Sequence, residues 1–148
     1  MSGTPFSALA FYMSKKGLGT TICHENQELF KNNQGVIDQY NFKFAMDEYK
    51  EYLKYAENYG AKIVNGMDIT VDVLKQKLQN GDLIILAGEI PGAYHAILLT
   101  GYDQNGFKVC DPLYKTKQNR TFDEIEKFMN TSIGKWFISV NDKTKEKY

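Results

Sequence analysis

Apolar residues change their spacing along the chain, and this change predicts which segments are helices and which are strands. In the first half, apolar positions recur every three or four residues or cover a whole segment, as is typical of helices. Helices are predicted over Pro5–Lys16, Cys23–Asn33, Ala45–Tyr59 and Thr70–Asn80, and a further short helix over Thr121–Asn130. In the second half, continuous or alternating apolar runs predict strands. These strands are Leu83–Ala87, Tyr94–Tyr102, Phe107–Asp111 and Lys135–Val140, with a short earlier strand at Ala61–Asn65.

The segment Pro5–Lys16 is apolar on nearly every face of the helix that it predicts. Proline fits the first helical turn, and a glycine follows the last one. Because a surface helix carries apolar residues on one side only, we expect this helix to be buried at the centre of the protein. Leu9 and either Phe11 or Tyr12 should then be inaccessible. The helix after Cys23 is more polar and is expected at the surface.

Turn and capping signals organise the second half of the chain. Asn105-Gly106 is a dipeptide favoured in tight hairpin turns, and Pro91-Gly92 marks another turn. Thr121 and Glu124 have the spacing of a capping box at a helix start. The predicted fold class is therefore α+β, with a helical half packed on a small antiparallel sheet. We expect one domain over residues 1–140, followed by a charged tail at 141–148.

Composition narrows the possible functions. The 148 residues are 43% hydrophobic, which is enough for a packed core, and 18 basic residues balance 18 acidic ones. A balanced charge does not favour nucleic acid as a partner, and no apolar run approaches the length of a membrane span. Two cysteines without paired spacing indicate neither a disulfide framework nor zinc, and no glycine-rich loop indicates a cofactor. No signal peptide is visible, so we expect a cytoplasmic protein.

His95 and Asp111 are candidates for catalytic chemistry. His95 begins an apolar strand, and Asp111 ends the following one, directly before Pro112. A hairpin folded at Asn105-Gly106 brings these two ends to the same edge of the sheet. A carboxylate there can orient an imidazole and stabilise its protonated form, as in a nucleophile–His–Asp site. The alternative is a structural histidine beside an ordinary Asp-Pro turn.

The sequence around these residues resembles the papain-like peptidases that process bacteriocin leaders at double-glycine sites, and their free-standing relatives. The resemblance is carried by L-K-Q-K-L-Q-N-G-D-L-I-I-L at 74–86, Y-H-A-I-L-L-T-G-Y-D at 94–103 and F-K-V-C-D-P at 107–112. It extends more loosely to the helix from Pro5. The resemblance implies a papain-like fold, with His95 as general base and Asp111 as its orienting partner. It also implies a peptide or protein substrate and a possible larger parent protein or transporter.

The nucleophile departs from the family pattern. That family places Cys-Gly at the start of a long apolar helix, with a glutamine shortly before it that completes the oxyanion hole. Here Ser2-Gly3 stands at that position, and no residue before it supplies the glutamine. Ser2 can be read as a replacement of cysteine in a shortened chain or as the residue of a non-catalytic relative. A third interpretation places the nucleophile at Cys23.

The sequence around Cys23 gives reasons for and against its being the nucleophile. It follows two threonines and could begin a helix, where the helix dipole would favour a thiolate. The segment after it is too polar for a core helix, so a half-buried thiol without a role is the alternative. We discount a pairing with His24, because neighbouring helical residues point in different directions. Cys110 neighbours Asp111 in a strand and should face the opposite side of the sheet.

These observations leave two functional hypotheses. The first is a papain-like cysteine peptidase or related acyl transferase, in which a thiolate attacks a carbonyl, His95 protonates the leaving amine and Asp111 orients His95. The second is a peptidase-like domain without catalysis that binds a peptide or protein partner. A row of tyrosines at 49, 52, 55 and 59 fits either helix packing or the wall of a peptide groove. We expect the start of the first helix, around Ser2, to lie nearer to His95 than Cys23 does.

Overall fold

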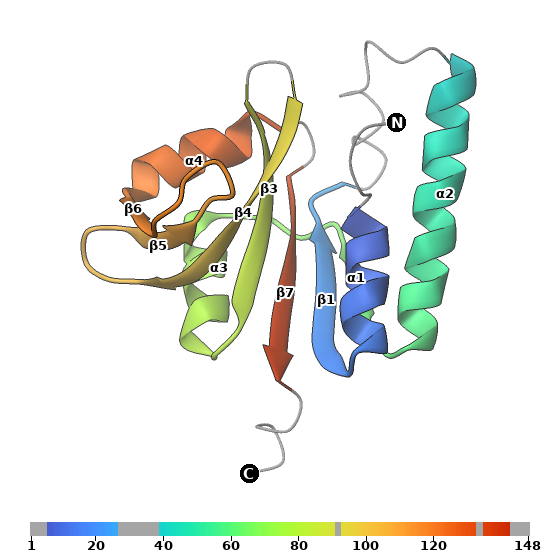
Figure 1. Ribbon diagram of the computed structural model, residues 1–148, viewed down its shortest axis with the longest axis horizontal. Coiled ribbons are helices and arrows are strands. Elements are labelled where there is room, and N and C mark those ends of the chain that lie inside the picture. Colours follow the sequence, from blue (N-terminus) through green and yellow to red (C-terminus); the bar gives the residue numbers. More distant parts are fainter. Residues whose placement is uncertain (1–5, 27–38, 91–92, 133–134, 143–148) are drawn as a thin grey trace.

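The structure, a computed structural model, describes residues 6–26, 39–90, 93–132 and 135–142. Helices and strands alternate in the first half of the described chain, and the second half consists mainly of successive strands (Figure 1). In order, the elements are α1 Phe6–Lys15, β1 Leu18–His24, α2 Gln39–Asn58, β2 Lys62–Asn65, α3 Val71–Gln79, β3 Leu83–Ile90, β4 Ala93–Tyr102, β5 Phe107–Cys110, β6 Gln118–Arg120, α4 Phe122–Asn130 and β7 Trp136–Asp142. The fold is mixed α+β, as the sequence predicts.

One seven-stranded sheet runs through the described residues, in the order β2-β1-β7-β3-β4-β5-β6. The pair β1–β2 is parallel, and the other neighbouring strands are antiparallel. The expectation of a small antiparallel sheet is therefore confirmed only in part, because the sheet has seven strands and one of its pairs is parallel. The last strand, β7, lies between β1 and β3 and joins the first half of the chain to the second.

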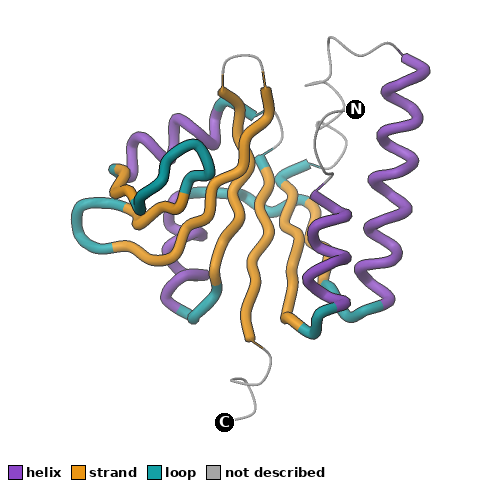
Figure 2. The backbone as a smooth tube through the Cα atoms, in the orientation of Figure 1, coloured by secondary structure: helices purple, strands orange, loops and turns teal. Residues whose placement is uncertain are grey.

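The sheet is covered on both faces, and each face has its own pair of helices (Figures 1 and 2). Alternate residues of β3 point to opposite faces: Leu86 packs in the core beneath α3 and α4, and Ala87 packs in the core with α1 and α2. Leu74 of α3 and Ile125 of α4 are fully buried on the first face. A strand whose two faces are both covered reads as a continuous apolar run, which is the pattern of Leu83–Ala87.

Helix α1 has the predicted bounds within one residue at each end, but it is not the buried central helix that was expected. It lies between β1 and α2 and buries only the side that faces them. Ala10 is fully buried, whereas Leu9 and Phe11 are half-buried and 58% of Tyr12 is exposed. An apolar composition on every face therefore did not mean burial on every face.

The helix predicted to begin at Cys23 is wrong at its start, because this cysteine lies inside strand β1. The segment L-G-T-T-I-C-H is rich in β-branched residues, which favour strands. It pairs with β2 in parallel and with β7 in antiparallel register. Glu25 and Asn26 are not helical either, and residues 27–38, which contain the remainder of the predicted helix, lie outside the described part of the chain.

Locally encoded ends and turns agree with the prediction. The Thr70 hydroxyl accepts a hydrogen bond from the Val73 N–H at 3.2 Å, and the Thr121 hydroxyl accepts one from the Glu124 N–H at 3.1 Å. The hairpin between β4 and β5 closes where the predicted Asn-Gly turn lies. At its end, a Cβ on Gly106 would lie 2.1 Å from the Arg120 carbonyl oxygen. Glycine thus permits the close approach of β6 to this turn.

Strand β7 continues to Asp142, which pairs with Leu18 of β1. The first two residues of the expected tail are therefore part of the sheet, and residues 143–148 lie outside the described chain. Among the described residues, no helix is both long and apolar enough to cross a membrane.

Candidate active site

The β4–β5 hairpin brings His95 and Asp111 into contact. His95 Nε2 lies 2.6 Å from Asp111 Oδ1, and the side chains are 12% and 3% exposed. The hydrogen bond that the sequence predicts between these residues is confirmed. A bulge between Leu99 and Gly101 shifts the register of the hairpin. The two side chains lie on the sheet face that carries α3 and α4.

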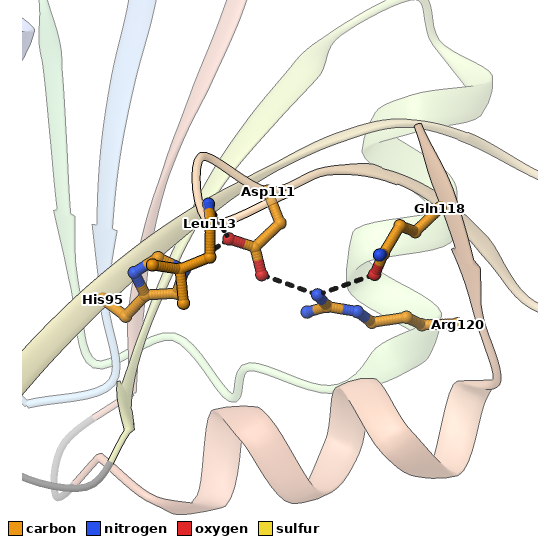
Figure 3. A network of polar contacts seen from close by, with 5 residues as sticks. All are labelled: His95, Asp111, Leu113, Gln118 and Arg120. Carbon is orange, nitrogen blue, oxygen red and sulfur yellow. Dashed lines mark hydrogen bonds and ion pairs between the residues drawn. The ribbon is translucent and has the colours of Figure 1, made fainter. Parts of the chain in front are cut away.

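The contact with Asp111 decides which nitrogen of the His95 ring carries hydrogen. An ionised carboxylate only accepts hydrogen bonds, so Nε2–H is the donor and the neutral ring has its lone pair on Nδ1. Nδ1 lies on the far side of the ring from Asp111 (Figure 3). A basic nitrogen that faces away from the carboxylate can accept a proton from a nucleophile placed there.

Asp111 is held as a buried anion by donors on both of its oxygens (Figure 3). Oδ1 also accepts the Leu113 backbone N–H at 3.0 Å, and Oδ2 accepts Arg120 Nη2 at 2.6 Å. Burial by itself raises the pKa of Asp111, but the hydrogen bonds from Leu113, Arg120 and His95 outweigh it and lower the pKa below the ordinary aspartate value. The carboxylate is therefore charged at neutral pH and available to a protonated histidine.

Sequence reasoning missed Arg120. It ends β6, which pairs with β5, and its guanidinium also donates to Gln118 Oε1 at 3.1 Å. One signal pointed to it: Arg120 is the single arginine of a chain with 17 lysines. The loop between Asp111 and Gln118 has no pattern that predicts its return, so the contact could not be deduced from spacing.

An open pocket of about 520 Å³ lies beside this network. His95, Asp111 and Arg120 line it from the sheet, and Lys127 and Phe128 line it from α4. The Phe128 ring meets the His95 ring edge-on, with centroids 6.4 Å apart. Among the described residues, no cluster of three or more His, Cys, Asp or Glu side chains could hold a metal ion.

Cys23 does not have the electrostatic setting that was considered for it. It is fully buried within β1 rather than at a helix start, and burial raises the pKa of its thiol to about 11. Nearby Lys77 lowers this pKa by a smaller amount. A thiol with such a pKa is almost entirely protonated at neutral pH and reacts slowly.

The strand register also separates Cys23 from His95. Cys23 pairs with Phe137, Phe137 with Leu86, and Leu86 with Ile97, two residues beyond His95. With about 4.8 Å between strands and about 3.4 Å per residue along them, the two Cα atoms are roughly 16 Å apart. Proton transfer needs contact at about 3 Å.

Cys110 and Ser2 are the other residues to consider as nucleophile. Cys110 pairs with Leu98 on the face opposite Asp111 and is half-buried. Its predicted direction, away from Asp111, is confirmed. Ser2 lies outside the described residues. The chain has no third cysteine.

The second histidine, His24, has a structural environment. Its Nδ1–H donates to the Val64 carbonyl at 3.3 Å, and its Nε2 accepts the Tyr49 hydroxyl at 2.5 Å. Its ring stacks on Trp136 with an interplanar angle of 7°. Burial lowers the pKa of His24, which keeps the ring neutral.

The tyrosines at 49, 52, 55 and 59 differ in burial: one is a core residue, and others lie at the surface. Tyr49 is 2% exposed and belongs to the core. Tyr52, Tyr55 and Tyr59 surround Phe11 of α1, with ring centroids 5.6–6.0 Å away. Tyr55 and Tyr59 are 41% and 49% exposed, so packing and a docking surface both remain open for them.

The chain matches the model of a known protein family. A family model described as "Peptidase_C39 like family" matches residues 7–141. The match spans every described strand from β1 through β6 and nearly all of β7. No curated protein and no solved structure matches the chain.

Proposed function

The chain belongs to the Peptidase_C39-like family, and from this premise we propose that it is a papain-like acyl-transfer domain that acts on a peptide. Family membership supports a peptidase-like domain. The contact between His95 and Asp111 carries the more specific proposal, because it orients a basic nitrogen away from its carboxylate partner.

The proposed chemistry is amide cleavage through a covalent acyl intermediate. Nδ1 of His95 takes the proton of the nucleophile as this attacks the peptide carbonyl. The imidazolium then gives the proton to the leaving amine, and the C–N bond breaks. Asp111 stabilises the positive ring through Nε2–H without itself being protonated. Water completes the cycle by hydrolysing the acyl intermediate.

We place the nucleophile position at the start of α1, around Ser2, rather than at Cys23. Helix α1 begins toward the end of the sheet where β4 begins (Figure 1), and His95 is the third residue of β4. A helix start also favours a thiolate through the helix dipole. Cys23 lies in a strand rather than at a helix start, it is fully buried, and strands β7 and β3 separate it from β4.

A second candidate function is peptide binding without catalysis. It is favoured by one observation: both cysteines of the chain lie away from His95. In this case the pocket beside His95 would hold a peptide or protein partner, and the His95–Asp111 pair would contribute hydrogen bonds. The substrate in either case is proposed to be a peptide, such as a leader with a double-glycine site.

Thiol reactivity separates the two candidates. Ser2→Cys should create a thiol that iodoacetamide alkylates rapidly near pH 6, because a depressed thiol pKa maintains the thiolate there. His95→Ala in the same background should slow that reaction strongly. Cys23 in the unaltered chain is the matched control, and we expect it to react no faster than a free thiol.

The outcomes point in different directions. An introduced cysteine that reacts like a free thiol would exclude an activating site at the start of α1 and favour the binding function. Rapid alkylation of Cys23 in the unaltered chain, abolished by His95→Ala, would make Cys23 the nucleophile. Cleavage of a double-glycine peptide by the Ser2→Cys variant but not by the unaltered chain would support the acyl-transfer proposal directly.

A further inference from the structure

Arg120 contacts the candidate pair from the side opposite His95. Its Nη2 lies 2.6 Å from Asp111 Oδ2, and the arginine side chain is 19% exposed. The other oxygen, Oδ1, receives both His95 Nε2–H and the Leu113 N–H. Each carboxylate oxygen therefore has its own set of donors.

This division of donors controls the rotation of the carboxylate. Without a donor on Oδ2, the carboxylate would be held through Oδ1 alone and could turn about its Cβ–Cγ bond. Rotation of Oδ1 would break its alignment with His95, since a hydrogen bond weakens steeply as it bends. The Arg120 contact prevents this turn and offsets the cost of burying Asp111 as an anion.

We propose that Arg120 is a positioning residue of this site, which holds the Asp111 carboxylate in the one orientation that fixes the hydrogen of His95 on Nε2. The inference rests on the proposed function, because it concerns the same His95–Asp111 pair. Arg120 acts through Asp111, whose Oδ2 accepts its Nη2–H.

The environment of Arg120 is built for a guanidinium. Gln118 Oε1 accepts a second bond from Nη2, and the guanidinium carbon lies 5.9 Å from the centre of the Tyr114 ring. Gly106 permits β6 to approach the hairpin closely at this residue. Both hydrogen bonds come from Nη2, and the planar guanidinium can in addition stack on the Tyr114 ring, which the compact, strongly hydrated ammonium of lysine does less well. The use of the only arginine at this position, in a chain with 17 lysines, agrees with that requirement.

The two histidines provide an internal comparison for a test. His95 donates from Nε2 to Asp111, whereas His24 donates from Nδ1 to the Val64 carbonyl. They therefore hold opposite neutral tautomers, which long-range proton–nitrogen NMR spectra distinguish. Spectra recorded near pH 9, where imidazole rings are neutral, should show one histidine with its hydrogen on Nε2 and the other with its hydrogen on Nδ1.

The experiment compares Arg120→Met with the unaltered chain. Arg120→Met should convert the single Nε2–H form of His95 into a mixture of both tautomers. The Asp111 carboxyl carbon should titrate at higher pH, because one of the contacts that lower its pKa is lost. His24 should keep its Nδ1–H form, which shows that the fold is intact. Lys127→Met is the matched control: it removes a cation from the same pocket and should change neither readout.

Two further variants keep the test decisive. Arg120→Lys should keep the Nε2–H form only in part, since a flexible stem with a strongly hydrated ammonium holds a carboxylate less rigidly than a planar guanidinium does. Arg120→Gln keeps a donor but no charge, and it replaces the methionine variant if that variant loses the folded His24 signal. Unchanged His95 tautomers and an unchanged Asp111 titration in Arg120→Met or Arg120→Gln would overturn the proposal.

Neither readout requires bond cleavage. A failed alkylation test at Ser2→Cys would refute the acyl-transfer function and leave the role of Arg120 standing. An unchanged His95 ring in Arg120→Met would refute the positioning role and leave the acyl-transfer function standing.

Discussion

Gly88 tests the packing that surrounds the candidate site. It lies on β3 directly opposite His95 of β4, and the ring of Phe128 from α4 covers it. A Cβ at residue 88 would lie 2.6–2.7 Å from three atoms of that ring. Carbon atoms pack at about 3.5–4.0 Å, so Gly88→Ala must move the ring by about 1 Å.

The expected cost of Gly88→Ala follows from which atoms are displaced. Overpacking a core typically costs about 1–3 kcal/mol. The contacting atoms are the outer end of a half-buried ring, which can swing toward solvent. We therefore expect the free energy of unfolding to fall by about 1–2 kcal/mol, in the lower part of that range. The ring should also move off His95 and change the chemical shifts of the imidazole.

Urea denaturation measures this loss, and the single tryptophan, Trp136, is a buried fluorescent probe for it. Gly101→Ala is the matched control on β4, because its Cβ would meet only Lys108 Cδ at 3.9 Å. It should change stability by less than about 0.5 kcal/mol. In a Phe128→Ala background, Gly88→Ala should also become nearly neutral, since the obstructing ring is gone.

Equal urea midpoints for Gly88→Ala, Gly101→Ala and the unaltered chain would refute this reasoning, because they would show that Phe128 does not cover Gly88. A loss that persists in the Phe128→Ala background would refute it in another way. The cost would then belong to the strand backbone rather than to the ring.

Two further predictions concern buried side chains, His24 and Leu74. Lowering the pH through about 6.5 should destabilise the protein through His24, because burial lowers its folded-state pKa and the unfolded chain then binds more protons. His24→Gln should flatten this dependence in urea titrations at several pH values, and parallel curves for both chains would contradict it. Leu74→Ala should cost about 2–5 kcal/mol, since Leu74 is fully buried. Tyr12→Ala, at a residue that is 58% exposed, should change the free energy of unfolding by less than about 0.5 kcal/mol. Equal losses for Leu74→Ala and Tyr12→Ala in calorimetry would contradict the assignment of Leu74 to the core and Tyr12 to the surface.

Features encoded within a few neighbouring residues could be predicted from the sequence. The caps at Thr70 and Thr121 depend on a hydroxyl and an N–H three residues later. The β4–β5 hairpin depends on a turn of a few residues between two apolar runs. Because this hairpin carries His95 and Asp111, their contact followed from the same local pattern.

Strand β1 could not be predicted in this way, because its partners are distant in sequence. Cys23 pairs with Val64 of β2 and Phe137 of β7. These neighbours complete a strand that its β-branched residues favour, and they also bury the thiol that was considered as the start of a helix. The exposure of Tyr12 has a similar origin, since which side of α1 is covered depends on where α2 lies.

The amino-acid sequence thus specified the hairpin, the helix ends and the His95–Asp111 pair, whose forces act over short stretches of chain. Assembly of the sheet then determined three further properties: the isolation of Cys23 from His95, the opposite tautomers of the two histidines and the contact of Arg120 with Asp111. Each of these depends on groups that come together only when distant strands pair. Burial and hydrogen-bond partners, which set a pKa or hold a side chain in place, are properties of that assembled neighbourhood.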